Sequence, residues 1–328
     1  MKNAEPVKRT SEIEELTNTY FIHPIASRLA SLFASLHISP NSVSVAGMTC
    51  GIAAGFAYYH YRDPVFAFSG LFLMIFWHVF DGADGQLARL THSQSQFGKV
   101  LDGVCDYTTF IAVYVGLAVA LSQQYGDWVW GVVVAAGACH AVQAAAYEVQ
   151  RQDYDFWGWG RKSAGLLDLS APPRDPTAAS LGQRVADRLH RLYVELQLLA
   201  TGVDFESRQK LAALLGLEPE HAASIRLLYR KVFAPSVRRW SVMSANYRTL
   251  GIFLFALLKV PLYYFYVEIA GLSAALAVLL YAQQARYTLF FMRWDAGDPT
   301  IRCAMPASMR DEEGKRPEPS HPAEAPLP

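Results

Sequence analysis

The chain has 328 residues and a formal net charge of zero; 52% of its residues are hydrophobic and only 18% are charged. Because an ordinary soluble domain carries about 25% charged residues, this composition argues against a soluble protein and favours a membrane protein. The cysteines, Cys50, Cys105, Cys139 and Cys303, are scattered, which argues against a disulfide framework and against a zinc site with paired ligands.

The N-terminal region, residues 1–40, is expected to be cytoplasmic or interfacial. Its first residues have mixed charge and no apolar core followed by small residues, so we expect no cleavable signal peptide. Residues 11–37 then place apolar side chains at helical spacing, with charge on the other side: Tyr20, Ile25, Leu29, Leu32 and Leu36. This pattern predicts a helix in the headgroup plane that ends at Ser39-Pro40. A cytosolic helix that packs on the later insertion fits the pattern equally well.

Six segments are apolar enough to cross a bilayer as helices, for which about 20 residues are needed. They are Val43–Tyr61, Val65–Phe80, Val100–Leu121, Trp128–Tyr147, Leu250–Val267 and Leu272–Met292. The sequence therefore predicts an all-α polytopic membrane protein with six transmembrane helices in three hairpins. Spans one to four would occupy residues 41–148, and spans five and six would occupy residues 249–293.

Basic residues are distributed unevenly around these spans. The connections expected to close the three hairpins, Arg62–Pro64, Ser122–Asp127 and Glu268–Gly271, contain one basic residue, Arg62. The opposite ends are rich in Lys and Arg, with fifteen of them from Arg151 to Arg248. By the positive-inside rule, both termini, residues 81–99 and the long insertion should face the cytoplasm.

Residues 149–248 are expected to form a polar insertion between spans four and five. It opens with QRQDYDFWGWGRK, whose basic and aromatic side chains suit anionic lipid headgroups, although a lid or a solvated subdomain also fits. After a Pro-rich joint, helical periodicity predicts two or three amphipathic helices, in a small cytoplasmic subdomain or along the membrane. The tail, residues 294–328, is rich in Pro and Glu and is predicted to be disordered.

Four aspartates stand beside the apolar runs: Asp81, Asp84, Asp102 and Asp106. At about 3.6 residues per turn, the first two share one face of span two's helix, and the last two share one face of span three's helix. The short loop THSQSQF joins these helices, so we expect all four carboxylates to converge. Such a cluster cannot stay ionised unaided, because like charges repel strongly in a medium of low dielectric. Divalent cations that prefer oxygen ligands, such as Mg²⁺ or Mn²⁺, would compensate for this repulsion.

Small residues and one arginine accompany these acids. Gly82, Gly85 and Ala88 leave room for a group to approach the backbone, and Arg89 carries a charged fork suited to phosphate. The combination predicts a diphosphate site. Small residues in membrane helices usually serve close packing, and for Gly82 alone packing is the favoured interpretation, but packing does not explain four acids with an arginine.

Written out, the stretch is Asp81-x2-Asp84-Gly85-x2-Ala88-Arg89-x8-Gly98-x3-Asp102-x3-Asp106. At all eight fixed positions it resembles the signature of the CDP-alcohol phosphotransferase (CDP-alcohol phosphatidyltransferase) family. His37–Met48 is more weakly similar to the entry to the first span in many members. The resemblance covers roughly Pro40 to Tyr147 and the last two spans, and it does not reach the insertion.

The resemblance implies a transferase of phospholipid synthesis that displaces CMP from a CDP-linked donor and joins the remaining phosphoryl group to an acceptor hydroxyl. It implies two divalent ions, Mg²⁺ or Mn²⁺, held by Asp81, Asp84, Asp102 and Asp106. Asp106 would also be the general base, because an alcohol is a poor nucleophile until a carboxylate takes its proton. Contacts to the donor would come from Gly82, Gly85, Ala88, Arg89 and Gly98, and more weakly from Asn41 and Ser44.

Neither donor nor acceptor can be identified from the motif, which concerns only the CDP portion. CDP-diacylglycerol could give its phosphatidyl group to a polar alcohol, which we favour, or a small CDP-alcohol of the choline, ethanolamine or inositol type could give a phosphoalcohol to a lipid hydroxyl. Candidates for acceptor contacts are Gln143, Glu148, Arg151, Lys259, Gln283, Gln284 and Arg286. The two arginines suit a phosphorylated acceptor but could equally be interface anchors. Lys259, expected near the middle of span five, should face a partner or a wet cavity, or snorkel toward Glu268.

Two other classes of protein fit the sequence less well. A divalent-cation transporter should carry acids or broken helices in several spans near the midplane, whereas these acids gather at one end beside Arg89. A catalytically inactive membrane scaffold is disfavoured, because none of the four aspartates is missing. We expect a membrane enzyme with its active site on the cytoplasmic side, in a bacterial inner membrane rather than the endoplasmic reticulum. Its partners would be donor, acceptor and lipid, without nucleic acid; a homodimer is left open.

Overall fold

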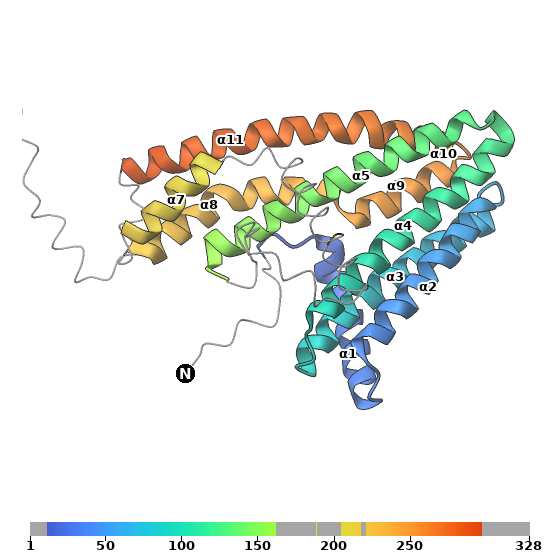
Figure 1. Cartoon of the computed structure of the whole chain (residues 1–328), viewed down its shortest axis with the longest axis horizontal. Helices are drawn as coiled ribbons and strands as arrows, with labels where there is room; N and C mark the ends of the chain where they lie inside the picture. Colours follow the sequence, from blue (N-terminus) through green and yellow to red (C-terminus); the bar gives the residue numbers. More distant parts are fainter. Residues whose placement is uncertain (1–11, 162–187, 189–204, 218–220, 297–328) are drawn as a thin grey trace, which may run out of the picture.

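The computed structural model describes residues 12–161, 188, 205–217 and 221–296. These residues form helices, and no strand occurs among them, so the all-α prediction is confirmed for this part of the chain. Three helices, α2, α3 and α4, run side by side, while α5 and α11 extend along the length of the molecule (Figure 1). The bounds of these helices are Pro40–Tyr59 for α2, Pro64–Leu90 for α3, Gln96–Tyr125 for α4, Trp128–Asp153 for α5 and Ser273–Asp295 for α11.

Short polar caps set where the first long helices begin. The N–H of Ser42 donates to Ser39 Oγ at 3.2 Å at the start of α2, and the N–H of Val65 donates to Asp63 Oδ1 at 2.9 Å at the start of α3. In both helices a proline follows the cap, where its missing N–H costs nothing and its φ already suits a helix. These helix starts are therefore determined locally by a few residues.

Four of the described helical segments are long and apolar enough to cross a membrane: Pro64–Leu90, Phe97–Tyr125, Trp128–Gly158 and Pro261–Asp295. They contain the predicted spans two, three, four and six. Predicted span one is a helix, α2, but it is not among these four. The structure thus supports an integral membrane protein and does not confirm six spans.

Predicted span five is not a single helix. α9 (Ala245–Leu257) ends at a turn, and α10 (Pro261–Tyr266) and the π-helical η6 (Val267–Leu272) then lead without a break into α11. The expected connection Glu268–Gly271 is therefore helical, and the chain turns earlier, because Pro261 cannot donate the hydrogen bond of a helix interior and starts the next helix instead. Lys259 lies exposed in this turn with a φ of 64°, and not in the middle of a span.

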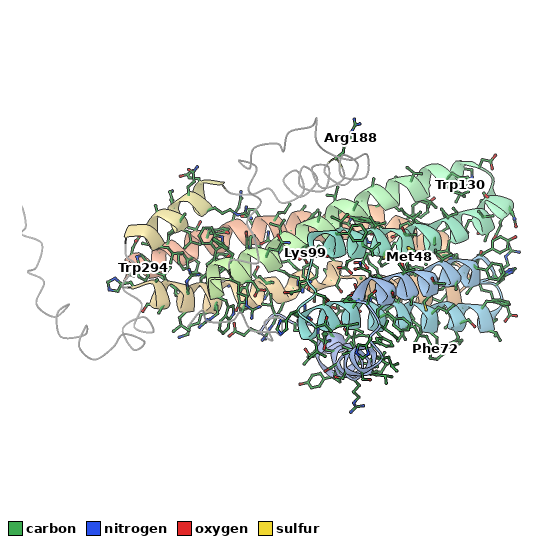
Figure 2. All side chains as sticks on the ribbon, turned by 60° about the horizontal axis from the view of Figure 1, so that its bottom comes forward. Met48, Phe72, Lys99, Trp130, Arg188 and Trp294 are labelled. Carbon is green, nitrogen blue, oxygen red and sulfur yellow. The ribbon has the colours of Figure 1, made fainter. Side chains whose placement is uncertain are left out.

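The N-terminal segment forms η1 (Asn18–Ile22) and α1 (His23–Ser35). Ala26 and Ala30 of α1 are buried against α3, whereas Leu32 and Leu36 of the predicted apolar face are 50% and 59% exposed. Figure 2 shows α1 nearly end-on while α2 and α3 run across the view. A crosswise helix with an exposed apolar face is what a helix in the headgroup plane requires, and its place in a membrane stays a prediction.

The described part of the insertion shares a hydrophobic core with the ends of α5 and α11. In that core, α8 (Ala222–Trp240) packs on η2 (Tyr154–Gly158), which continues α5, and Leu211 of α7 (Phe205–Leu217) belongs to the same cluster. Arg226 of α8 donates to the carbonyls of Phe156 and Trp157, at 2.9 and 3.0 Å. In the QRQDYDFWGWGRK stretch, Tyr154 and Trp157 are buried and Phe156 is partly buried, whereas Trp159 is 42% exposed. Its contact with lipid stays a prediction. The helix predicted after the Pro-rich joint, residues 1–11 and the tail beyond residue 296 lie outside the described residues.

Glycines allow α2 and α4 to touch backbone to backbone. A Cβ added to Gly55 would lie 2.4 Å from the carbonyl oxygen of Ala112, and one added to Gly116 would lie 2.1 Å from the carbonyl oxygen of Gly55. Gly47, Gly51 and Gly55 recur every fourth residue, which is the small-residue pattern of closely packed membrane helices. This close approach holds the beginning of α2 beside the acid-bearing parts of α3 and α4.

Replacing Gly55 by alanine should lower the midpoint of thermal unfolding in detergent. The new methyl group would overlap a backbone oxygen, which cannot move aside as a flexible side chain would, and such overpacking costs about 1–3 kcal/mol. Gly131→Ala in α5 is the matched control, because no atom lies within 4 Å of its Cβ. The control should be neutral or stabilising by up to about 1 kcal/mol, since alanine favours a helix. Equal midpoints for the two variants would contradict the backbone contact.

Candidate active site

The predicted acids lie where α3 ends and α4 begins. α3 closes after Leu90, where His92 adopts a φ of 52° and the N–H of Ser93 donates to the Ala88 carbonyl at 3.0 Å. α4 starts a few residues later at a serine cap, with the N–H of Gly98 donating to Ser95 Oγ at 2.9 Å. The two helices are therefore antiparallel neighbours, and their acid-bearing ends lie beside α1, away from the turns at the other end of the molecule (Figure 1).

Three of the four predicted aspartates come together. One carboxylate oxygen from each of Asp81, Asp102 and Asp106 lies within 4.8 Å of the others, and all three side chains are partly exposed. Three oxygen donors at this spacing suit a hard divalent cation, which takes carboxylate ligands and leaves positions for water or substrate oxygens. The local helical spacing and the short turn together produce this group.

Asp84 occupies a different position from these three. Its side chain is buried, with 5% exposed, and it accepts a hydrogen bond from Ser44 Oγ of α2. Ser44 Oγ also lies 3.2 Å from the Pro40 carbonyl, so the first turns of α2 hold it in place. The hydrogen bond orients the Asp84 carboxylate and ties α2 to the acid-bearing end of α3.

All four aspartates line one pocket between α2, α3 and α4. Its lining residues are Ser44, Gly47, Trp77, Asp81, Asp84, Asp102, Cys105 and Asp106. Sequence reasoning missed Gly47, Trp77 and Cys105. Helical spacing points to the first two, because Trp77 lies one turn before Asp81 and Gly47 lies one turn after Ser44. The pocket therefore has carboxylates on several sides and an indole as an apolar wall.

Most of the residues predicted to contact the donor lie near these aspartates. A Cβ on Gly85 would lie 3.6 Å from Arg89 Nη1, so the guanidinium of Arg89 reaches back over Gly85. A Cβ on Gly98 would lie 3.5 Å from Asn41 Oδ1, so Asn41 of α2 and Gly98 of α4 are neighbours. Ala88 is partly exposed in the last turn of α3. The missing side chains at the two glycines leave the backbone accessible beside polar groups that suit a nucleotide diphosphate.

Gly82 faces another direction. A Cβ there would lie 3.3 Å from Ala26 Cβ and 3.5 Å from Ile22 Cγ2, which belong to α1 and η1. Gly82 thus lets the N-terminal helix approach α3 closely. This contact favours the packing interpretation over a role in donor binding.

The predicted acceptor residues on α5 have partners of their own. Glu148 accepts a hydrogen bond from Arg151 at 3.2 Å, and the Arg151 guanidinium lies 5.5 Å from the centre of the Tyr147 ring. Gln143 is fully buried and binds Arg248 at 2.9 Å. None of the predicted acceptor residues is among the residues that line the pocket in the described part of the chain.

The remaining acceptor candidates lie along α11 or far from the acids. Gln283 is buried and accepts a hydrogen bond from Ser236 of α8 at 3.1 Å, whereas Gln284 is exposed and Arg286 is partly exposed. Lys259 lies in the turn between α9 and α10, at the end of the molecule away from α1 (Figure 1). The structure therefore gives Lys259 no place beside Asp106. His140 of α5 contacts the rings of Phe110 and Tyr114.

Part of the chain matches a known protein family. Residues 37–171 match the family model of the CDP-alcohol phosphatidyltransferases. No curated protein and no solved structure matches the chain. The matched residues include every position of the eight-residue signature and every residue that lines the pocket. Over these residues, the match supports the resemblance to the CDP-alcohol phosphatidyltransferase family.

Proposed function

We propose that the protein transfers the phosphatidyl group of CDP-diacylglycerol to the hydroxyl group of an acceptor alcohol, with release of CMP. The observation that carries this proposal is the pocket with four aspartates at the end of α3 and α4, inside the residues that match the family. Its acids lie at the ends of helices apolar enough to cross a membrane. The acyl chains of a lipid donor could thus remain in the bilayer while its headgroup reaches the acids. We place this end of the helices at the cytoplasmic face of a bacterial inner membrane.

Two divalent ions, Mg²⁺ or Mn²⁺, would be held by Asp81, Asp84, Asp102 and Asp106. The residues fit such ions, because three of the carboxylates approach within 4.8 Å and the fourth is oriented by Ser44 in the same pocket. When bound, the ions would neutralise charge on the diphosphate and on the departing CMP. Their absence would leave several carboxylates to repel one another beside an apolar bundle.

The other roles in the proposed transfer would be filled by side chains of the protein. Asp106 would accept the proton of the acceptor hydroxyl as the new phosphorus–oxygen bond forms. Arg89 would bind phosphate oxygens with its guanidinium fork, which neutralises charge that develops during the transfer. Gly85, Ala88 and Gly98, with Asn41 beside them, would leave room for the cytidine.

One assay distinguishes the two donors. The purified full-length protein in detergent, with Mg²⁺ or Mn²⁺, is given CDP-diacylglycerol or CDP-aminoalcohols together with polar or lipid acceptors, and CMP release is followed. We expect CMP with CDP-diacylglycerol and a polar alcohol. CMP release only from a small CDP-alcohol with a lipid acceptor would replace the proposed donor. No CMP from any pairing, together with cation flux in liposomes, would contradict a transferase and favour a cation transporter.

Asp106→Asn should reduce the turnover number by about 10²–10⁴-fold, because the amide cannot accept the proton of the acceptor hydroxyl. Binding of the donor, measured by equilibrium dialysis with labelled CDP-diacylglycerol in mixed micelles, should change little. Asp127→Asn makes the same chemical change in the exposed turn between α4 and α5, and this control should leave turnover as in the wild type. Unaltered turnover in Asp106→Asn would remove its assignment as the base.

Chelation should abolish CMP release. After dialysis against EDTA, activity should return when Mg²⁺ or Mn²⁺ is added, and Asp81→Asn should raise the metal concentration needed for half-maximal activity by about tenfold or more, since one of three adjacent oxygen ligands is replaced by a neutral amide. Metal content is verified by mass spectrometry. Full activity in verified metal-free protein would show that the acids serve another purpose.

Arg89→Lys should raise the KM for the donor by about tenfold, because lysine keeps the charge and loses the two-pronged fork that fits phosphate. The comparison variant is Arg62→Lys, an exposed arginine that donates to Gln124 at 2.7 Å in the first hairpin turn. That variant should keep the wild-type KM. If both variants bind the donor equally well, Arg89 does not contact its phosphates.

A further inference from the structure

A fully buried ion pair lies outside the pocket and outside the signature. Arg248, near the beginning of α9, pairs with Glu268 of η6, and the two residues are 2% and 0% exposed. Charged groups inside a membrane protein are costly and often have a functional reason. The π-helical turn that carries Glu268 is also a kind of segment found frequently at functional sites.

The ion pair is part of a hydrogen-bond network that joins α9 to α5 and to the continuous α10–η6 segment. The Arg248 guanidinium also donates to the Met243 carbonyl at 3.2 Å and to Gln143 Oε1 of α5 at 2.9 Å. In return, the Gln143 amide donates to the Glu268 carbonyl at 3.0 Å, and the Tyr264 hydroxyl donates to the Glu268 carboxylate at 2.7 Å. These bonds hold the beginning of α9 in one position relative to α5 and η6.

The next residue along α9 reaches the helix that carries the acids. Thr249 Oγ1 lies 3.0 Å from Nε2 of His78 on α3, and both side chains are buried. The His78 ring lies against the ring of Trp77, with 4.4 Å between the ring centres, and Trp77 lines the pocket. On its other side Trp77 makes an edge contact with Phe110 of α4, at 5.3 Å. A continuous series of contacts thus runs from the ion pair to the apolar wall of the pocket.

We propose that Arg248 and Thr249 are positioning residues for the transfer reaction, a proposal that rests on the proposed function. Arg248 holds the beginning of α9, and Thr249, through His78, holds the turn of α3 that carries Trp77 and Asp81. Neither residue lines the pocket, so their effect passes through α3. A small displacement of this wall would alter the distance between the acceptor hydroxyl and the carboxylates. The rate of the transfer step depends on this distance far more strongly than the affinity for the donor does.

The test compares two substitutions of Thr249 that differ in the hydroxyl group. Thr249→Val keeps the shape of the side chain and removes the bond to His78, whereas Thr249→Ser keeps that bond. We expect the valine variant to lose about tenfold or more in kcat, with the KM for the donor and the unfolding midpoint close to wild type, and we expect the serine variant to retain kcat. Thr288→Val, in an exposed position of α11, is the control and should behave as wild type.

A second set of variants separates positioning from stability. Arg248→Met and Glu268→Gln each leave one charge buried without its partner, so each should lower the unfolding midpoint. The double variant buries no charge and should recover the midpoint. We expect the double variant to remain deficient in kcat, because the bonds that hold α9 are gone. Recovery of both kcat and midpoint would show that the ion pair only stabilises the fold, and would overturn the role of Arg248.

The outcomes separate the two proposals. If the wild type releases no CMP, the proposed function fails, and the positioning role fails with it. If the wild type releases CMP and Thr249→Val turns over as fast as Thr249→Ser, only the positioning role is overturned. Should the double variant not fold, the Thr249 pair decides the question, because neither substitution places a charge in the interior.

Discussion

The repulsion between carboxylates at the edge of an apolar helix bundle is the constraint on which the rest of the structure depends. Asp81, Asp102 and Asp106 present oxygens within 4.8 Å of one another, and Asp84 is buried in the same pocket. Water would screen such charges, but the end of a membrane bundle screens them poorly. Bound cations, as proposed above, would offset this repulsion, and cations beside an arginine would suit a diphosphate.

Placing these acids together requires close helix packing. Gly55 and Gly116 allow α2 and α4 to meet at their backbones, and Gly47, one turn after Ser44, lies against Phe80 and Trp77 of α3, the helix that carries Asp84. In the second half of the chain, Thr249 of α9 bonds to His78 of α3, and this contact links α9 to an acid-bearing helix. The pocket belongs to the part of the chain that matches the family, whereas the elements that hold its wall extend beyond that part.

The sequence predicted features that depend on near neighbours and failed where distant contacts decide. The sequence left Gly82 open as a donor contact or a packing residue, because a small residue beside an acid fits either role; the fold places it against Ala26 of α1. The hydropathy of residues 250–267 suggested one span, because average hydropathy does not register the effect of Pro261 on the backbone. The aromatic stretch around Trp157 suggested a lipid surface, but the fold buries Tyr154 and Trp157 in the core that α8 shares and leaves Trp159 42% exposed.

By itself, the sequence determined the all-α class, the acid set with its family, and the starts of α2, α3 and α4. Each of these rests on interactions between residues a few positions apart: helical spacing, a cap followed by proline, and a short turn between two helices. The tertiary structure alone decided that Asp84 pairs with Ser44, that Trp77 forms the pocket wall, and that Arg248 meets Glu268. These partners lie on different helices, and their contact depends on how the whole bundle packs, which local patterns do not encode.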